Sequence, residues 1–153
     1  FDIIDVRISN VYGPTKLIRP DIVPSIIWSL IHKKSASVWT KKPIRDFIFV
    51  DDAIDSVLKL IKSKFSGTVN LGTGIGSSVG QLCTYLEELS GIEIVDQNIK
   101  VPGHMEFFQD ISLLKSLINW TPKYSLKEGL TKTYNTMMEY YKEEEVKESL
   151  KNF

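Results

Sequence analysis

A chain of 153 residues with 42% hydrophobic and 25% charged residues is long enough for one domain with its own core, and this composition is typical of a soluble globular protein. Its 19 basic and 19 acidic residues cancel, and no basic stripe stands out, which argues against nucleic acid as a partner. No apolar run approaches the roughly 20 residues of a membrane span, and no signal peptide pattern is present, so we expect a cytoplasmic protein that does not enter a membrane.

The first half of the chain alternates predicted strands with a helix. Residues 3–8, "IIDVRI", are apolar and β-branched and predict a strand, which the turn "SNVYGPTK" follows. Apolar residues recur at helical spacing over residues 22–33, with Asp21 as a candidate N-cap. "SASVW" predicts a short strand, and the alternation in "RDFIFV" predicts a strand over residues 45–50.

The second half is predicted to be richer in helix. Its expected elements are a helix over residues 53–63 with Asp51 and Asp52 as candidate caps, a strand over 67–74 that ends in glycines, a helix over 78–91 ended by Gly91, a short strand over 93–96, and helices over 110–118 and 126–145. The residues predicted to face the core are Ala53, Val57, Leu60 and Ile61 in the first of these helices, and Leu126, Leu130, Tyr134, Met137, Met138 and Tyr141 in the last. Alternating strands and helices predict an α/β fold.

The segment "NLGTGIGSSVG" follows a predicted strand and opens a helix, as a dinucleotide-binding turn does. Its glycines Gly72, Gly74 and Gly76 are spaced G-x-G-x-G, however, and the fingerprint requires G-x-G-x-x-G. Asp96 lies at the distance expected for a ribose-binding acid, but not at the end of a clear strand. We interpret the segment as a glycine turn that leads into a helix capped by Ser77 or Ser78.

The stretch "ISNVYGPTK" contains a literal Tyr-x-x-x-Lys in Tyr12 and Lys16. These two side chains meet only if the stretch is helical, because residues four apart share a helix face. Gly13 and Pro14 follow Tyr12 at once and disfavour a helix, so the spacing does not indicate a catalytic pair.

The single cysteine, Cys83, has no partner for an internal disulfide and lies on the apolar face of a predicted helix. A buried, inert thiol is therefore expected in preference to a nucleophile. The two histidines and this cysteine have unrelated spacings, which predicts no metal site.

Four stretches, "RISNVYGP", "RDFIFVDDAIDSVLKLI", "VNLGTGIGSSVGQL" and "DISLLKSLINWTPKYSLKEGL", together resemble in order and spacing the C-terminal half of the extended short-chain dehydrogenase/reductase family. The family comprises NAD-dependent nucleotide-sugar epimerases and dehydratases of carbohydrate biosynthesis, with UDP-galactose 4-epimerase as the best-known member. The resemblance extends to about residue 140 and implies an α/β fold in which a few strands and helices complete an upstream Rossmann sheet.

In that family the glycine fingerprint, the catalytic Ser or Thr and the helical Tyr-x-x-x-Lys all precede the first of these stretches. The resemblance therefore implies that residues 1–153 are the C-terminal nucleotide-sugar-binding portion, without the N-terminal portion that binds most of the NAD. The first residue, Phe1, and the immediate start in a strand agree with a missing beginning. The resemblance implies that this portion alone is inactive and that the intact enzyme is a homodimer.

The family's turn beside the nicotinamide and the sugar matches residues 7–14 here. Ile8 and Ser9 are accordingly expected to contact the cofactor, and Asn10 to hydrogen-bond the nucleotide-sugar. The alternative for Asn10 is a turn residue that bonds its own backbone. Tyr12 is expected to pack beneath the turn, and Lys16 to face solvent.

The segment "DIVPSII" resembles the one that frames the nucleotide base, which places Asp21 and Ile22 near that base. "SVW" matches the short strand that holds the base, so Val38 and Trp39 are expected there. Trp39 would supply a flat face for stacking, with an ordinary core position as the alternative.

Arg45 matches the family arginine that grips the diphosphate, and a planar, permanently charged fork suits two phosphates. The alternative is a salt bridge to a neighbour such as Asp46. Asp52 matches an aspartate that caps the next helix, a structural role.

The segment "NIKVPGHMEFFQD" departs from the family, whose members often place a second Arg, a Gly-Asp pair and an aromatic here. Lys100 and Phe107 are the candidate substrate contacts in this chain, while His104 removes an acceptor for a ribose hydroxyl. Ser9 also stands where relatives often have a bulky aromatic. The nucleotide and the sugar are therefore left open.

Three functions remain after this reading. The first is an NAD-dependent epimerase or dehydratase acting on a nucleotide-activated sugar, that is, isomerase or lyase chemistry. The second is a reductase or decarboxylase on the same scaffold, and the third is a non-catalytic sugar-nucleotide-binding module, since fold alone does not decide function. An upstream reading frame with a glycine fingerprint and a helical Tyr-x-x-x-Lys would favour an enzyme.

Overall fold

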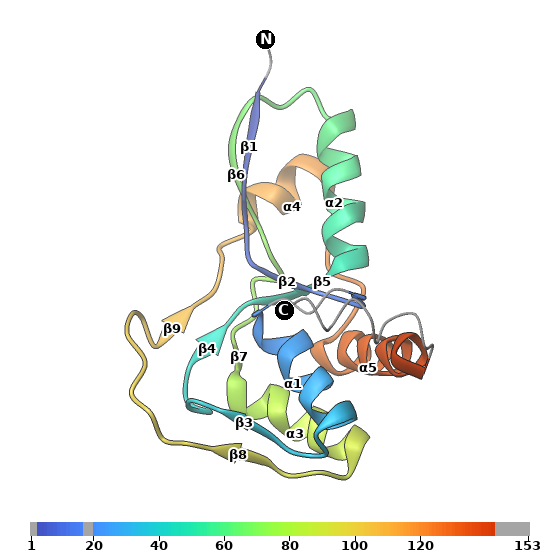
Figure 1. Cartoon of the computed structure of the whole chain (residues 1–153). Helices are drawn as coiled ribbons and strands as arrows, with labels where there is room; N and C mark the ends of the chain where they lie inside the picture. The colour runs from blue at the N-terminus through green and yellow to red at the C-terminus, as the bar shows by residue number, and fades with distance from the viewer. Residues whose placement is uncertain (1–2, 17–19, 143–153) are drawn as a thin grey trace.

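A computed structural model describes residues 3–16 and 20–142 (Figure 1). In chain order its elements are β1 (Ile4–Ile8), β2 (Asn10–Tyr12), α1 (Ile22–His32), β3 (Ala36–Val38), β4 (Ile44–Arg45), β5 (Phe47–Phe49), α2 (Val50–Lys62), β6 (Gly67–Leu71), β7 (Ser77–Ser78), α3 (Val79–Ser90), β8 (Ile94–Asp96), β9 (Glu106–Phe107), α4 (Ser112–Ile118) and α5 (Leu126–Lys142). The predicted α/β class is confirmed. The predicted helix over 126–145 is confirmed as far as Lys142, and its last residues lie outside the described part of the chain.

The strands form four small sheets, three of them parallel pairs. β1 pairs in parallel with β6, from Ile4 opposite Gly67 to Ile8 opposite Leu71. β2 pairs with β5, and β3 pairs with β8, also in parallel. The fourth sheet has the order β7-β4-β9, in which β4 and β7 are antiparallel. Parallel partners require long crossovers, and α1, α2 and α3 lie in these crossovers, whereas α4 and α5 follow the last strand, β9.

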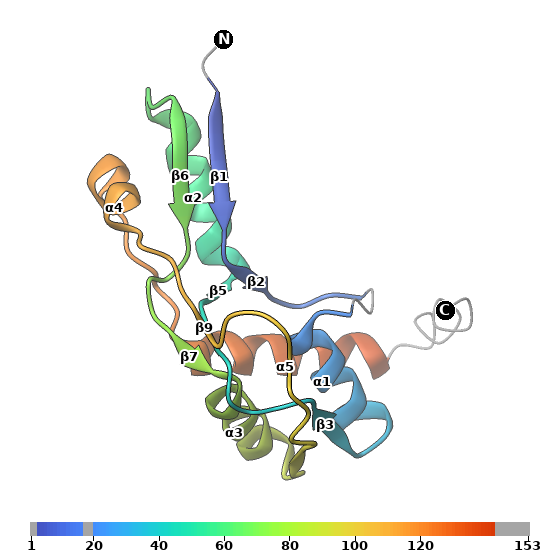
Figure 2. The ribbon, with the colours of Figure 1, turned by 90° about the vertical axis from the view of Figure 1, so that its left-hand side faces the viewer.

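The molecule has two hydrophobic cores, and β5 lies between them. The first core contains Phe47 and Phe49, and the second contains Ile48, because successive side chains of a strand point to opposite faces. The second core lies between the β1–β6 pair and helices α2 and α4, at the top of Figures 1 and 2. The first core lies among α1, α3 and α5 below (Figure 2). The junction at β5 therefore carries the residues that face both halves.

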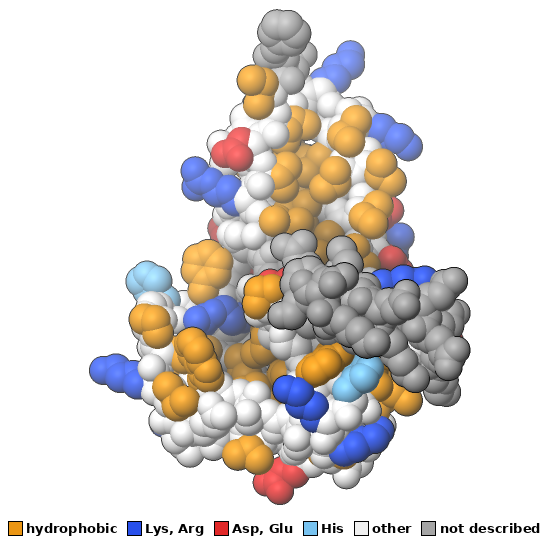
Figure 3. All heavy atoms as spheres, viewed as in Figure 1, with side chains coloured by type: hydrophobic (Ala, Val, Ile, Leu, Met, Phe, Trp, Pro, Cys, Tyr) orange, Lys and Arg blue, Asp and Glu red, His pale blue; other side chains and the backbone are white. Residues whose placement is uncertain are grey.

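The prediction that Ile61 of α2 faces the core is wrong. Ala53 and Leu60 are buried and Val57 packs against the second core, but Ile61 is 67% exposed. Together with Ile54 and Leu58, each 53% exposed, Ile61 forms an outward apolar face of α2. Figure 3 shows hydrophobic side chains gathered over the part of the surface where β1 and α2 lie.

The predicted strand over 45–50 is broken at Asp46 into β4 and β5, and α2 already begins at Val50. The predicted caps of α2 are wrong as well, since Phe49 occupies the N-cap position without a side-chain cap bond. Asp52 is 1% exposed and instead accepts hydrogen bonds from the backbone amides of Lys123 at 3.0 Å and Tyr124 at 3.0 Å. Its structural role is thus to fix the segment that precedes α5.

Other helix ends follow local chemistry more closely. Asp21 occupies the N-cap position of α1, although its side chain makes no cap hydrogen bond. The Ser78 hydroxyl accepts from the Gln81 amide at 3.0 Å and caps α3, as predicted. Gly91 ends α3 with a φ of 70°, a left-handed conformation that suits glycine.

Gly129 lies in α5 where that helix meets Tyr12, and it yields a prediction opposite to helix propensity. A Cβ at this position would overlap the Tyr12 hydroxyl and lie 2.9 Å from its Cζ. We therefore expect Gly129→Ala to lower the free energy of unfolding by about 1–3 kcal/mol through overpacking, although alanine in a free helix gains about 1 kcal/mol. Chemical denaturation measures the change.

Tyr12→Phe supplies the control for Gly129→Ala, because phenylalanine lacks the hydroxyl that the new methyl group meets. The double variant should recover part of the loss seen in Gly129→Ala alone. A Gly129→Ala protein as stable as wild type would contradict the packing argument.

Candidate functional site

Tyr12 and Lys16 do not lie in a helix, so they lack the geometry that the catalytic spacing requires. Tyr12 ends β2, is 5% exposed, and donates its hydroxyl to the Leu126 carbonyl at 3.3 Å. Burial, with a contribution from the nearby Asp52 carboxylate, raises the pKa of Tyr12 far above its ordinary value. Lys16 is exposed, and its Nζ lies 5.2 Å from the centre of the Tyr140 ring. The prediction for both residues is confirmed.

The glycine segment is a turn whose amides are already engaged. Asp46 accepts hydrogen bonds from the amides of Thr73 at 2.9 Å and Gly74 at 3.1 Å. These amides are therefore not available to a pyrophosphate, which supports the interpretation as a glycine turn. Gly74 has a φ of 72°, and a Cβ at Gly72 would overlap the Asp46 carboxylate, so the glycines serve the turn.

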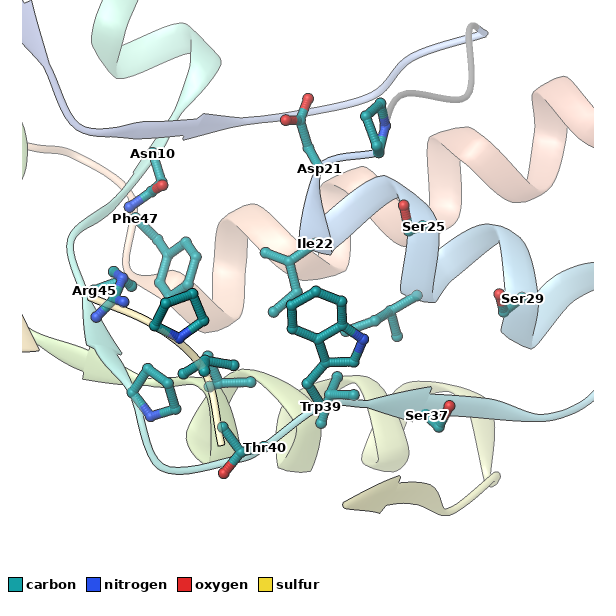
Figure 4. A pocket seen from close by; sticks show the side chains of 17 residues that line it. Asn10, Asp21, Ile22, Ser25, Ser29, Ser37, Trp39, Thr40, Arg45 and Phe47 are labelled. Carbon is teal, nitrogen blue, oxygen red and sulfur yellow. The ribbon is translucent and has the colours of Figure 1, made fainter. Parts of the chain in front are cut away.

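A cavity of about 640 Å³ opens between the N-terminal part of α1 and the end of β3. Six of the predicted substrate-contacting residues line it: Asn10, Asp21, Ile22, Val38, Trp39 and Arg45. They come from four separate segments between residues 10 and 45. Figure 4 shows Asn10 and Arg45 at one end of the cavity and Trp39 between β3 and α1.

Trp39 presents a free aromatic face at this cavity. Its side chain is 62% exposed, so the alternative of an ordinary core position is excluded. The preceding Val38 is 7% exposed and anchors the strand in the first core. A flat, solvent-accessible ring on a rigid strand end is suited to stacking on a planar group.

Arg45 is half-buried, and its guanidinium is held by backbone carbonyls. Nη1 donates to the Ile44 carbonyl at 2.8 Å and to the Met105 carbonyl at 3.1 Å. Within residues 3–16 and 20–142 it forms no salt bridge, and the proposed alternative, an ion pair with Asp46, is absent there. The positive charge at the cavity wall is therefore not neutralised by a carboxylate among the described residues.

Asn10 begins β2, and its amide nitrogen donates to the Asp46 carbonyl at 3.1 Å. This bond differs from the local turn bond that was the alternative, because it joins residues 36 positions apart. It fixes the side chain while its oxygen has no hydrogen bond within the described part of the chain. An oriented acceptor thus stands at the same end of the cavity as Arg45 (Figure 4).

A second cavity of about 590 Å³ adjoins the first and shares Asn10, Asp21, Ile22 and Phe47 with it. Ile8 and Ser9, the predicted cofactor contacts, line this second cavity. Its described lining contains no Lys or Arg, so it suits a group without negative charge and not a diphosphate. The Ser9 hydroxyl oxygen is buried and has no hydrogen-bond partner among the residues that the structure describes.

The chain is similar in sequence to known proteins. Residues 1–72 match the NAD dependent epimerase/dehydratase family model. The chain is 32% identical over 152 residues to a probable GDP-L-fucose synthase 1 of Oryza sativa subsp. japonica, covering 91% of this chain and 46% of that one. It is 33% identical over 139 residues to a UDP-glucuronate 4-epimerase of Thermodesulfobacterium geofontis, covering 88% and 42%.

The chain is also similar to solved structures, over a similar share of its length. A mutant UDP-glucuronic acid 4-epimerase from Bacillus cereus, in complex with UDP-4-deoxy-4-fluoro-glucuronic acid and NAD, superposes with a TM-score of 0.80 at 27% identity over 92% of this chain and 46% of that one. A UDP-glucose 4-epimerase from Thermotoga maritima with UDP-glucose gives 0.81 at 26% identity over 90% and 46%. Just under half of the chain, residues 1–72, thus matches the NAD dependent epimerase/dehydratase family model, and most of the chain resembles the relatives and solved structures above.

The chain spans about half the length of the curated family members it matches, 46% of the rice protein for example. Its fold corresponds to the C-terminal part of these extended short-chain dehydrogenases. The predicted resemblance is thereby confirmed. Across the described residues, no helix combines the length and apolarity that a membrane crossing needs.

Two residues predicted to contact the substrate lie outside both cavities. Lys100 is exposed, while its neighbours Val101 and Pro102 line the first cavity. Phe107 is 52% exposed in β9, where its carbonyl accepts from the Asp46 amide at 3.2 Å. The structure therefore brings the backbone of this segment to the site, but not these two side chains.

The first cavity also has polar lining that the sequence reasoning missed. Ser25 and Ser29 of α1 and Ser37 of β3 add hydroxyl groups at the end away from Arg45 (Figure 4). The spacing of Ser25 and Ser29, four residues apart on the predicted helix, was an available signal, because such residues share a face.

Cys83 does not contribute to the site. It is fully buried in α3, and burial raises the pKa of its thiol to about 11. The prediction of a buried, inert thiol is confirmed, since the thiolate is the reactive form.

Proposed function

We propose that the intact protein is an NAD-dependent enzyme that acts on a nucleotide-activated sugar, as an epimerase, dehydratase or reductase. The observation that carries this proposal is the first cavity, where an exposed indole, an unneutralised guanidinium and an oriented amide line one space. These groups suit a base, a diphosphate and a hydroxyl respectively. Similarity to the NAD dependent epimerase/dehydratase family supports the same assignment.

In this proposal the two adjoining cavities have different occupants. The nucleoside diphosphate occupies the first cavity, with Trp39 on the base and Arg45 on the phosphates. The sugar and the nicotinamide ring of NAD meet in the second cavity, which is lined by Ile8 and Ser9 and carries no cation among its described residues. Bound NAD would supply hydride transfer there.

The dinucleotide phosphates require a site elsewhere, because the only glycine segment of the described chain has its amides bonded to Asp46. We propose that this site and the catalytic acid–base residues belong to a preceding NAD-binding portion of the intact protein. The apolar face of β1 and α2, which includes Ile3 at 68% exposure, is a surface that this portion would cover. A cytoplasmic homodimer remains our expectation for the intact enzyme.

Activity assays on the intact protein and on residues 1–153 test this proposal. Each is incubated with NAD and a UDP-, GDP- or dTDP-sugar, and products are followed by chromatography and by absorbance of reduced cofactor. We expect turnover by the intact protein and none by residues 1–153, which lack the expected acid–base pair. Conversion by residues 1–153 alone would contradict the proposal that the catalytic acid–base residues belong to the preceding portion.

The same assay separates the remaining candidate functions. Tight binding of a nucleotide-sugar by the intact protein without any conversion would identify a non-catalytic binding module. With NADH supplied in place of NAD, net oxidation of the cofactor would identify a reductase, whereas an epimerase returns the hydride and leaves the cofactor unchanged.

A further inference from the structure

Asp46 is a fully buried carboxylate at the break between β4 and β5. Oδ1 accepts from the Thr73 amide at 2.9 Å and the Thr73 hydroxyl at 2.6 Å. Oδ2 accepts from the Gly74 amide at 3.1 Å and the Gln109 amide at 3.3 Å. Both oxygens are thus saturated by donors from two other segments, which satisfies the requirement that a buried charge be hydrogen-bonded.

The carboxylate has little freedom to move. Gly72 lies against it, and a Cβ there would overlap Oδ2 and the Ser9 hydroxyl. In the described part of the chain, no Lys, Arg or His forms an ion pair with Asp46. Its four hydrogen bonds therefore determine where the segments at Thr73 and Gln109 lie relative to β4.

The segment over 105–109 connects Asp46 to Arg45. It runs beside β4, since the Ile44 amide donates to the Met105 carbonyl at 2.8 Å and the Asp46 amide donates to the Phe107 carbonyl at 3.2 Å. The far end of this segment is held by the Asp46 carboxylate through the Gln109 amide. The near end supplies the Met105 carbonyl, which accepts from Arg45 Nη1 at 3.1 Å.

We propose that Asp46 is a positioning residue for Arg45. By binding the Gln109 amide it holds the 105–109 segment in place, and the Met105 carbonyl of that segment then aims the Arg45 guanidinium at the diphosphate of a nucleoside diphosphate. The side chains of the segment add little burial, with Met105 at 45% and Phe108 at 51% exposure, so its position depends on its two backbone bonds to β4 and on the Gln109 anchor. This inference rests on the proposed function.

Asp46→Asn separates the two oxygens. Asparagine keeps one acceptor for the Thr73 bonds, but its amino group does not accept from the amides of Gly74 and Gln109. We expect the intact variant to bind UDP, GDP or dTDP, whichever wild type binds, about 10-fold more weakly by calorimetry. Thr73→Val is the matched control, because it removes one Asp46 bond and leaves the Gln109 anchor, and its affinity should stay within about twofold of wild type.

Coupling to Arg45 distinguishes positioning from a general loss of structure. In an Arg45→Ala background, Asp46→Asn should change nucleotide affinity less than about twofold, because no guanidinium remains to be aimed. A full additional loss in that background would overturn the inference. An Asp46→Asn affinity equal to wild type would also overturn it, provided that Arg45→Ala weakens binding.

A ligand-free measurement keeps the two proposals distinguishable. In wild type, nuclear magnetic resonance should show slow exchange of the Gln109 amide and an ordered Arg45 side chain. In Asp46→Asn, faster exchange at Gln109 should accompany loss of Arg45 order. Rapid exchange of the Gln109 amide in wild type, or an Arg45 side chain unchanged in the variant, would overturn the inference whether or not any nucleotide binds. Failure of wild type to bind any nucleotide would overturn the proposed function.

Discussion

Arg45→Ala is expected to weaken nucleotide-sugar binding to the intact protein by about 2–4 kcal/mol, or about 30- to 900-fold in Kd. The guanidinium stands at the wall of the first cavity, and the described chain provides no carboxylate that already neutralises it. Its loss leaves the diphosphate without a charged, two-pronged donor. NAD affinity should hardly change, because the second cavity has no contact with Arg45.

Calorimetric titration with UDP, GDP and dTDP measures this effect and also reports the preferred base. Arg45→Lys should recover only part of the loss, since an ammonium keeps the charge without the planar fork. Arg7→Ala is the matched control: its side chain is 70% exposed, faces Asp5 at 4.0 Å, and lines neither cavity. Equal affinities of wild type and Arg45→Ala, with nucleotide bound measurably by both, would end the diphosphate assignment.

Local patterns predicted most of the helices and strands, because apolar residues recur at a different spacing in each type of element. The β-rich stretch "RDFIFV" contains β5, and the helical spacing in "AIDSVLKLI" corresponds to α2. The helical period of α2 was predicted correctly, but Ile61 was assigned to the wrong face. The apolar residues of α2 occupy more of the helix surface than one core covers. Ile54, Leu58 and Ile61 consequently lie on the outward face, 53–67% exposed. Which face of such a helix is inside depends on its neighbours, and a single sequence does not specify them.

The candidate site was predictable where the backbone path is simple. Asn10, Asp21, Trp39 and Arg45 lie at the ends of regular elements, and these ends meet at one cavity. The segment over 97–110 contains only the two residues of β9, so its side-chain directions follow from contacts with β4 that no local pattern encodes. This explains why Val101 and Pro102 reach the cavity although Lys100 was predicted to do so.

Buried acidic residues were the least predictable feature. The sequence predicts Asp46 as a polar position in a strand and Asp52 as a helix cap. In the structure, both are buried and accept hydrogen bonds from distant amides. Asp46 reaches residue Gln109, 63 positions away, and Asp52 reaches Lys123, 71 positions away. Sequence shows that an aspartate can accept hydrogen bonds, and only the folded chain shows from which donors.

Asp52→Ala is expected to lower the free energy of unfolding by about 2–4 kcal/mol, the second large effect. The Asp52 carboxylate accepts from the Lys123 amide through both oxygens, at 3.0 and 3.1 Å, and from the Tyr124 amide at 3.0 Å. Alanine leaves these part-buried amides without an acceptor and opens a void between α2 and the start of α5. Asp52→Asn keeps one acceptor oxygen and should lose about half as much.

Asp51→Ala makes the comparison stringent, because it removes the neighbouring carboxylate from the same helix turn. The Asp51 side chain is 52% exposed and lies 3.5 Å from Lys132 Nζ, so its loss should cost no more than about 0.5 kcal/mol. If the helix macrodipole were the main role of these aspartates, both substitutions would cost similar amounts, since both lie in the first turn of α2. Urea denaturation of the three variants decides between the two explanations. Equal losses for Asp51→Ala and Asp52→Ala would restore the capping role that the sequence suggested, whereas a loss confined to position 52 assigns its stabilisation to the amides before α5.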